Sequence, residues 1–289
     1  MESVAVGFFD GVHLGHQAIL KGADAALTFR NHPLSVLAPE KAPRLIMSVE
    51  ERVAAIKACG VEDVTVLDFT PELAAMSAEE FIVSFLTRQE WRVPSVRCGE
   101  NWRFGKGGVG DAEFLRKRGI AVEVAPYAEY KGERISSSRI RAALERGEIE
   151  DANEMMGRKF KVSGFRFQGK GLGMKLGYPT VNAEVLKHGF DGSNEYSRIL
   201  LRYGVYEVEV EGLKGIANYG LAPTMGDKAW TRPILEIHFP GASSDPLNSH
   251  DSCSELPVSF LRFIRPERKF DSVADLQRQI AADCATITT

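Results

Sequence analysis

The pattern of apolar residues changes near Gly157, and this change limits what the chain can fold into. Before Gly157, short apolar runs alternate with stretches that carry helical stripes. The first run, residues 4–9, lacks strict alternation, as expected for a strand covered on both faces. Further strands are expected at residues 27–29, 64–67, 93–98 and 120–124. Two helices are expected to begin at capping boxes, one formed by Ser48 with Glu51 and one by Ser77 with Glu80. This β–α alternation predicts an α/β domain with a doubly wound parallel sheet.

After Gly157 the strands alternate in polarity. In residues 233–239 every second side chain is apolar, which places Glu236 and His238 together on the opposite face. A final helix is expected from Ser272, with an apolar stripe assigned to the core: Val273, Leu276, Ile280 and Cys284. This half therefore predicts a small antiparallel β-barrel with a C-terminal helix. The expected domains are residues 1–157 and 158–289.

Composition excludes several classes of protein. The chain has 289 residues, which is comfortable for two domains, and a formal net charge of -3, which gives no global basic field for nucleic acid. Its four cysteines are far apart in the sequence, and no apolar run approaches the ~20 residues that span a bilayer. Met1 is followed almost at once by the first strand. We expect a cytoplasmic protein with no nucleic-acid or membrane partner, and a monomer or weak homo-oligomer.

The stretch at residues 4–20 predicts a strand, a tight turn at Asp10 and Gly11, and the start of a helix. His13, Gly15 and His16 fall at that start. A helix N-terminus attracts anions because its first N–H groups are unpaired and its dipole is positive there. This arrangement suits the phosphates of a nucleoside triphosphate.

Two more segments of the first half carry chemistry. A glycine-rich loop, residues 99–111, follows an expected strand, so it lies with the residue 10–16 loop at the carboxyl ends of the strands, where such sheets bind ligands. A helix is expected after Ile135, capped by Ser137 or Ser138. Ser137 and Arg141 near its start are good donors to phosphate oxygens.

The second half opens with a glycine-rich segment, residues 168–182. Gly169, Gly171 and Gly173 allow the backbone to wrap phosphates. Thr180 and Asn182 are two residues apart and share a face of an extended strand. Their hydroxyl and amide oxygens suit Mg²⁺.

Together these motifs resemble a known family. GFFDGVHLGH with ISSSRIR is similar to the Rossmann-like nucleotidyltransferase superfamily, and GKGLG with YPTVN and a later glutamate resembles riboflavin kinase. In this order, over nearly the whole chain, they resemble the bifunctional bacterial riboflavin kinase/FMN adenylyltransferase family, also called FAD synthetase. The resemblance implies Mg²⁺-dependent phosphorylation of riboflavin to FMN by ATP, and adenylylation of FMN to FAD with release of pyrophosphate.

The resemblance also implies residue roles. His16 and Arg141 would be catalytic in adenylyl transfer, and Glu236 would be the general base of the kinase. Thr180 and Asn182 would bind Mg²⁺. Implied flavin-binding residues are Asn31, Pro33 and Arg265. Implied nucleotide-binding residues are Gly7, Phe9, Asp10, Gly11, His13, Gly15, His16, Asn101, Ser137 and Arg141 in the first module, and Gly169, Gly171 and Gly173 in the second.

Three segments depart from the family pattern. Residues 17–27 are shorter than the family's helix and loop, which predicts a tight connection. Asn31 stands where the family has a proline. In the kinase half, the polar stretches before Gly204 and at residues 239–255 are longer, and their weak hydrophobicity predicts mobile loops.

Other interpretations stay open. One module could be inactive, or the chain could be a non-catalytic flavin or nucleotide sensor. A tRNA-synthetase-like role shares the HxGH pattern but fits the acidic balance poorly. For single residues, Ser137 could be only a helix cap, the glycines near residue 170 a flexible hairpin, and Glu236 a solvated surface carboxylate.

Overall fold

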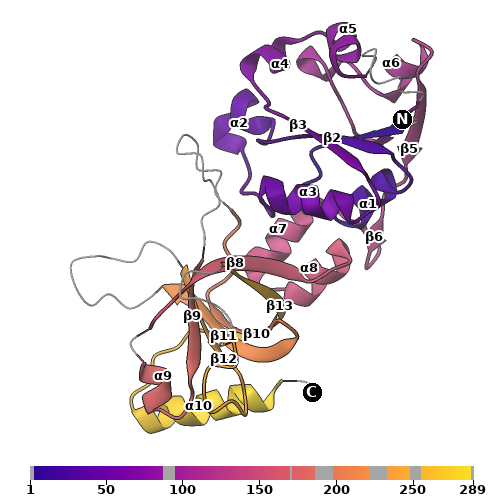
Figure 1. Cartoon of the computed structure of the whole chain (residues 1–289). Coiled ribbons are helices and arrows are strands. Elements are labelled where there is room, and N and C mark those ends of the chain that lie inside the picture. The colour runs from indigo at the N-terminus through magenta and orange to yellow at the C-terminus, as the bar shows by residue number, and fades with distance from the viewer. Residues whose placement is uncertain are drawn as a thin grey trace. The chain divides into compact units, whose positions relative to one another are not determined.

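The computed structural model describes residues 3–86, 95–169, 171–185, 198–221, 233–247 and 255–287. It falls into two compact units, the first built mainly from the chain up to Ile140 and the second mainly from the chain after it (Figure 1). Each unit is described by itself.

The first unit contains a parallel five-stranded sheet in the order β3-β2-β1-β4-β5. Its strands are β1 (Ser3–Val6), β2 (Ala25–Phe29), β3 (Asp63–Leu67), β4 (Ser95–Gly99) and β5 (Ala121–Ala125). The chain runs from β1 outward to β3, then crosses back to place β4 on the other side of β1. The predicted doubly wound sheet is confirmed, and its switch point, where such sheets bind ligands, lies between β1 and β4.

Helices cover both faces of this sheet (Figure 1). Ala5 packs into one core with α1 (Leu14–Leu20) and α3 (Val49–Lys57), whereas Val4 and Val6 pack into another with Phe81. The remaining helical segments of the unit are α2 (Leu34–Leu37), η1 (Pro39–Lys41), α4 (Pro71–Ala75), α5 (Ala78–Phe81), the π-helical η2 (Ile82–Leu86), η3 (Lys106–Gly108) and α6 (Ala112–Arg116). Burial on both faces explains why β1 shows no alternation.

Local sequence signals set several helix starts. The two expected capping boxes, Ser48 with Glu51 and Ser77 with Glu80, are both formed. The short connection at residues 17–27 is accommodated by a seven-residue α1 and an immediate return, so that β1 still pairs with β2 from Val4↔Ala25 onward.

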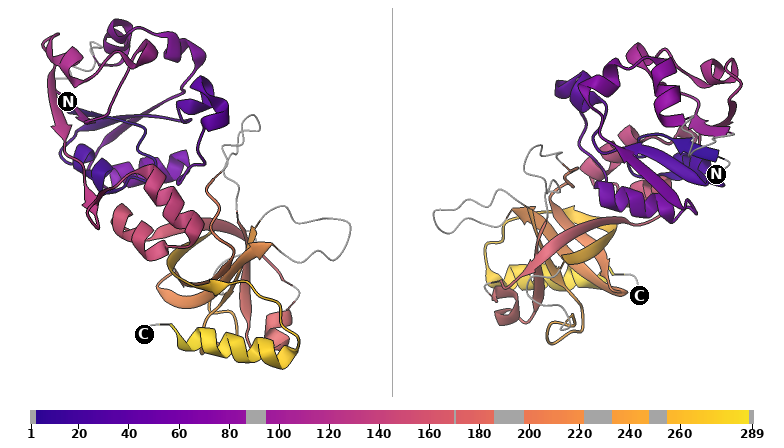
Figure 2. Two further views of the ribbon diagram at one scale, coloured as in Figure 1. Left: turned by 180° about the vertical axis from the view of Figure 1, so that it is seen from behind. Right: turned by 45° about the horizontal axis from the view of Figure 1, so that its top comes forward.

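The second unit is a closed barrel in the order β10-β11-β12-β9-β8-β13, flanked by a C-terminal helix, as predicted (Figure 2). Its strands are β8 (Phe160–Phe167), β9 (Thr180–Val185), β10 (Gly204–Val210), β11 (Leu213–Leu221), β12 (Pro233–His238) and β13 (Glu255–Pro266). The other elements after β5 are β6 (Glu129–Tyr130), β7 (Glu133–Arg134), α7 (Ser137–Arg146), α8 (Ile149–Met156), α9 (Leu172–Lys175) and α10 (Val273–Ala285). Tyr206, Tyr219 and Phe260 fill the barrel interior.

Two expectations about this unit were wrong. The apolar stripe of α10 is not simply core: Val273 is 59% exposed, and Leu276 and Ile280 line a cavity. The first part of the polar stretch after β12 is anchored rather than loose, because Leu247 is buried and its carbonyl accepts a hydrogen bond from Arg166. Residues 248–254, and the stretch at 186–197, lie outside the described residues.

Asn153 on α8 joins two barrel strands. Its side chain donates to the Phe260 carbonyl at 2.9 Å and accepts from the Phe160 amide at 2.6 Å. We expect Asn153→Ala to lower the free energy of unfolding of this unit by about 1–3 kcal/mol, because both backbone groups lose their partner. Chemical unfolding followed by circular dichroism measures this. The exposed neighbour Glu154→Ala is the control, and equal loss in both variants would contradict the assignment.

Candidate active sites

The turn after β1 has an unusual backbone. Phe9 and Val12 have φ angles of 56° and 36°, although neither is glycine, and Gly11 has 84°. A β-branched residue at positive φ is strained, and such strain persists only where surrounding contacts hold it. The strained turn therefore marks this loop as a candidate site.

Asp10 supplies those contacts. Its carboxylate is almost fully buried and accepts hydrogen bonds from the backbone N–H of Ile46, at 3.0 and 3.1 Å, and of Met47, at 3.2 Å. The hydroxyl of Ser137 donates to the Asp10 carbonyl at 2.8 Å. Asp10 thus ties the turn to the segment before α3 and to the start of α7.

The two histidines form one stacked pair. Their ring centroids lie 3.6 Å apart with the planes at 17°, and the Phe9 ring meets the His16 ring edge-on. His13 Nδ1 accepts the backbone N–H of His16 at 3.3 Å and so caps α1. Because Nδ1 is an acceptor, a neutral His13 ring carries its proton on Nε2, which can donate to a phosphate oxygen. A side chain at Gly15 would press on the His13 ring at 3.2 Å.

The helix after Ile135 begins differently from the expectation. Ser136, not Ser137 or Ser138, accepts the backbone N–H of Arg139 at 3.2 Å. Ser137 is consequently available for Asp10, and Arg141 lies one turn beyond Ser137 on α7.

Two other predicted residues have contrasting surroundings. Asn101 is exposed in the turn that follows β4, the neighbour of β1 in the sheet. Asn31 is buried, and both hydrogens of its amide are used, by Ser35 Oγ at 3.0 Å and the Phe69 carbonyl at 2.9 Å. Its amide oxygen accepts the backbone N–H of Phe69 at 2.8 Å, so a flavin contact by Asn31 would come from its backbone or from the second lone pair of that oxygen. Pro33 leads into α2 beside it.

The barrel presents one polar face. Pairing in register aligns Asn182, Glu236 and Asn218 in a row across β9, β12 and β11, and the next row joins Thr180 with His238. The opposite faces of these strands carry apolar residues, as period-two alternation requires. The predicted metal, base and nucleotide residues thus meet on one surface.

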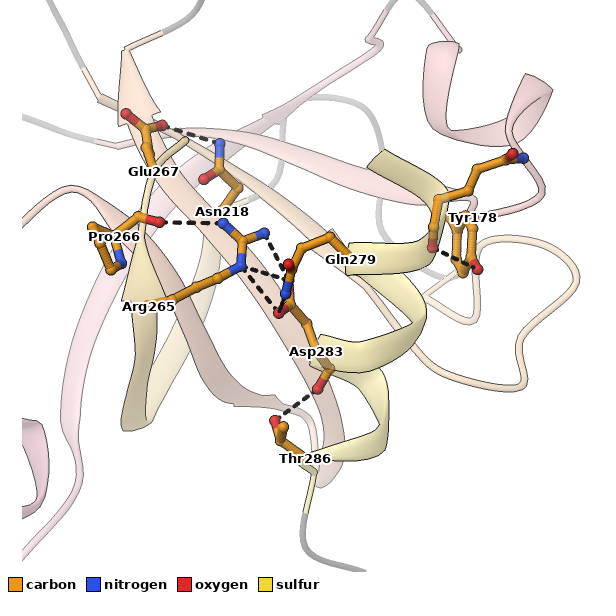
Figure 3. A network of polar contacts seen from close by, with 9 residues as sticks. Tyr178, Asn218, Arg265, Pro266, Glu267, Gln279, Asp283 and Thr286 are labelled. Atoms are coloured by element: carbon orange, nitrogen blue, oxygen red, sulfur yellow. Dashed lines mark hydrogen bonds and ion pairs between the residues drawn. The ribbon is translucent and has the colours of Figure 1, made fainter. Parts of the chain in front are cut away.

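A cavity of about 580 Å³ opens beside this face. Polar residues from three sides line it: Asn218, Glu236 and His238 from the strands, Arg265 and Glu267 from the end of β13 and the segment after it, and Asp283 from α10. Figure 3 shows Arg265 held by the Asp283 carboxylate, at 2.7 to 3.0 Å, while Asn218 donates to Glu267 at 3.3 Å.

The electrostatics of Glu236 suit a base. Its side chain lines the cavity and is exposed to solvent, yet desolvation by the surrounding residues raises the pKa of Glu236, with a further contribution from the negative charge of Glu267. The adjacent His238 ring is fixed by a contact between its Nδ1 and the Pro179 carbonyl at 2.9 Å.

A second cavity, of about 300 Å³, lies along the glycine-rich segment and includes Thr180 and Asn182 in its lining. A Cβ added at Gly169 would come within 2.4 Å of Asn182 Nδ2, and one at Gly173 within 2.4 Å of the Tyr178 carbonyl. Glycine is therefore required for this approach. Gly173 itself belongs to the short helix α9 rather than to an open loop.

The donor set fits a hard cation. The described residues contain no group of three His, Cys, Asp or Glu side chains that could hold a metal ion. Thr180 and Asn182 offer two neutral oxygens, which suits Mg²⁺ that keeps waters and takes its remaining ligands from a phosphate.

Comparison with known proteins decides the family. Residues 1–139 match the family model described as FAD synthetase, and residues 156–289 match the one described as riboflavin kinase. The bifunctional riboflavin kinase/FMN adenylyltransferase of Escherichia coli K12 is 32% identical over 97% of this chain and 90% of its own length. That of Bacillus subtilis is 30% identical over 97% and 89%. The chain belongs to the bifunctional riboflavin kinase/FMN adenylyltransferase family.

A solved structure agrees in fold but carries another title. The crystal structure titled "Macrolide-efflux Protein from Streptococcus pneumoniae" superposes with a TM-score of 0.80 and 28% identity, over 98% of this chain and 92% of that one. Among the described residues of this family member, no helix is long and apolar enough to cross a membrane.

Sequence reasoning missed part of the cavity wall. Arg265 was predicted, but its partner Asp283 was not, and Asn218, Glu267 and Tyr178 were also missed. The available signal was an aspartate on the expected apolar side of α10, next to Cys284. A buried carboxylate demands a cationic partner, which could have directed attention to it.

We predict that Asp10→Asn lowers FAD formation by about 10- to 100-fold, because the new amide group places N–H against the amides of Ile46 and Met47. FMN formation stays unchanged. Initial rates resolved by chromatography test this. Asp24→Asn, at the opposite end of the same strands, is the matched control. Unchanged FAD formation by Asp10→Asn would contradict a phosphate-binding role for the turn.

The raised pKa of Glu236 also sets a pH dependence. A base must be deprotonated, so riboflavin kinase activity should fall as the pH drops through this raised pKa, which lies above the ~4.3 of an ordinary glutamate. Glu267→Gln removes a negative charge and should move the acidic limb of kcat/KM to lower pH. An acidic limb at or below the pH typical of free glutamate would exclude Glu236 as the base.

Proposed function

We propose that the chain makes FAD in two steps: its barrel phosphorylates riboflavin with ATP to give FMN, and its parallel-sheet unit transfers the adenylyl group of a second ATP to FMN. The observation that carries this is the presence of two separate sets of predicted phosphate-binding residues, the histidine-capped turn in one unit and the glycine-lined cavity in the other, within a chain whose relatives align over 97% of its length.

In adenylyl transfer, a phosphate oxygen of FMN attacks the α-phosphorus of ATP and pyrophosphate leaves. His13, through Nε2–H, and His16 contact the phosphates, while Arg141 on α7 stabilises the leaving pyrophosphate. Ser137 joins it when its hydroxyl turns from the Asp10 carbonyl to a phosphate oxygen. Gly7, Phe9, Gly11, Gly15 and Asn101 complete the nucleotide site. Since the Asp10 carboxylate accepts hydrogen bonds from backbone N–H groups, its role is to hold the turn in shape. Positioning and charge stabilisation carry most of such catalysis.

In the kinase, Glu236 accepts the proton of the ribityl hydroxyl as the hydroxyl oxygen attacks the γ-phosphorus of ATP, and ADP leaves as the bond from the γ-phosphorus to the bridging oxygen breaks. The protein backbone at Gly169, Gly171 and Gly173 wraps the phosphates of the nucleotide. Thr180 and Asn182 would hold Mg²⁺. When bound, the cation neutralises developing charge on the phosphates. Arg265 on the cavity wall contacts the flavin, and in the other unit Asn31 and Pro33 do so.

Further expectations accompany this proposal. The functional domains divide at residues 157 and 158, the protein acts in the cytoplasm as a monomer or weak homo-oligomer, and it has neither nucleic-acid nor membrane partners. Inactivity of one module, or binding without turnover, is the alternative to a bifunctional enzyme.

The test separates the two activities. With riboflavin, ATP and Mg²⁺, the wild-type protein should yield FMN and then FAD. His16→Ala should lose FAD formation only, because it leaves the barrel intact, and Glu236→Ala should lose FMN formation only. Glu209→Ala, a carboxylate of the same barrel in an ion pair with Lys159, is the matched control.

Each outcome decides between interpretations. No FAD from supplied FMN would reduce the claim to a kinase, and binding of both flavins without product would favour a sensor. Loss of both activities in either active-site variant would contradict two independent sites.

A further inference from the structure

Arg52 on α3 is fully buried, although no role in either reaction has been given to it. Burial lowers the pKa of its guanidinium to about 10, and the charges of Asp10 and Glu50 act in the opposite direction. The side chain therefore remains a cation at neutral pH. A buried cation is costly unless its surroundings compensate, and an apolar residue of similar volume would avoid that cost.

The contacts of Arg52 converge on the carboxyl ends of two strands. Its Nη2 donates to the carbonyls of Phe29, at 2.5 Å, and Arg30, at 3.2 Å, at the end of β2. Its guanidinium lies 4.3 Å from the centre of the Phe8 ring, just after β1. Within the described part of the chain, its Nε and Nη1 have no hydrogen-bond acceptor, so the ring face is the surface that compensates this side of the cation.

Phe8 links Arg52 to the segment that contains the proposed flavin-binding residues Asn31 and Pro33. Its ring meets the His32 ring edge-on at 4.8 Å, and its carbonyl accepts the Thr28 hydroxyl at 2.9 Å. His32 Nδ1 in turn accepts the backbone N–H of Leu34, and the His32 carbonyl accepts the Ser35 hydroxyl. The series Arg52, Phe8, His32 therefore ends in the segment that contains Asn31 and Pro33.

We propose that Arg52 is a positioning residue for FMN in adenylyl transfer. Its guanidinium donates to two carbonyls at the end of β2 and lies against the Phe8 ring. Because the Phe8 ring contacts His32, these contacts set the position of the His32–Pro33 backbone. The proposal rests on the proposed flavin-binding role of Asn31 and Pro33. It predicts that Arg52 affects FMN binding more than ATP binding, because the hydrogen bonds that hold Asp10 come from the backbone of Ile46 and Met47 rather than from Arg52.

The test is a steady-state comparison of full-length variants. Arg52→Met keeps most of the volume but removes charge and donors, so the KM for FMN in FAD formation should rise by about 10-fold or more, with kcat and the KM for ATP nearly unchanged. Arg52→Lys can still donate to both carbonyls but cannot lay a planar group on Phe8. It should restore part of the loss and give an intermediate KM.

Two controls exclude a merely structural role. Ile56→Ala, fully buried one turn further along α3, removes apolar packing of the same helix but leaves the hydrogen bonds to the Phe29 and Arg30 carbonyls and the Phe8 contact in place, and should leave the KM for FMN unchanged at a matched loss of melting temperature. The melting temperature of each variant reports on the folding of the parallel-sheet unit, and its riboflavin kinase activity reports that the barrel is folded. If Arg52 acts through Phe8, Phe8→Leu should raise the KM for FMN by itself and add less than its full effect to Arg52→Met.

The outcomes are distinct. A wild-type chain that forms no FAD would refute the proposed function rather than the role of Arg52. An unchanged KM for FMN in Arg52→Met, a fall in kcat alone, an equal rise in both KM values, or a rise in the KM for FMN in Ile56→Ala of the same size would each overturn the positioning role.

Discussion

The candidate adenylyl-transfer site depends on the hydrogen bonds that the buried carboxylate of Asp10 accepts. A turn with Phe9 and Val12 at positive φ is not a conformation that the chain would adopt by itself. Three hydrogen bonds to the backbone of Ile46 and Met47, with the bond from Ser137, hold it in place. The stacked histidines follow directly, because the end of this turn is the cap of α1. The strained turn therefore depends on hydrogen bonds from backbone groups far away in the sequence.

The barrel positions its candidate site residues by regular strand pairing rather than by a strained turn. No positive φ at a non-glycine residue occurs within its described active-site strands; regular pairing instead brings side chains from β9, β12 and β11 into one row. The positions of Asn182, Glu236 and Asn218 follow from strand register alone, and a shift of one residue would turn all of one strand's members inward. In this unit precision comes from hydrogen-bonded ladders, and the glycines serve only to let the backbone approach.

The sequence was sufficient wherever chemistry is local. Capping boxes at Ser48 and Ser77, the alternation around Glu236 and the unalternating run of β1 all depend on neighbours a few residues away, and all were predicted correctly. What could not be predicted depends on distant partners. The hydroxyl of Ser137 was expected to cap a helix, to bind phosphate, or to do both. It donates instead to the carbonyl of Asp10, 127 residues away, and Ser136 makes the cap. The apolar stripe of α10 was assigned to the core because periodicity cannot tell a packed surface from the wall of a cavity.

The ion pair of Arg265 and Asp283 holds α10 in place where it forms one wall of the cavity. An apolar helix face laid against an open cavity gains less from burial than one laid against a filled core, since part of its surface stays in contact with solvent. The carboxylate of Asp283 is buried and takes three hydrogen bonds from Arg265 and one from Gln279. Such a charge-assisted, bidentate pair has a defined geometry that apolar packing lacks. It fixes α10 at the distance that leaves the cavity beside Glu236 open, so the position of a wall far along the chain determines whether the proposed base can reach a substrate.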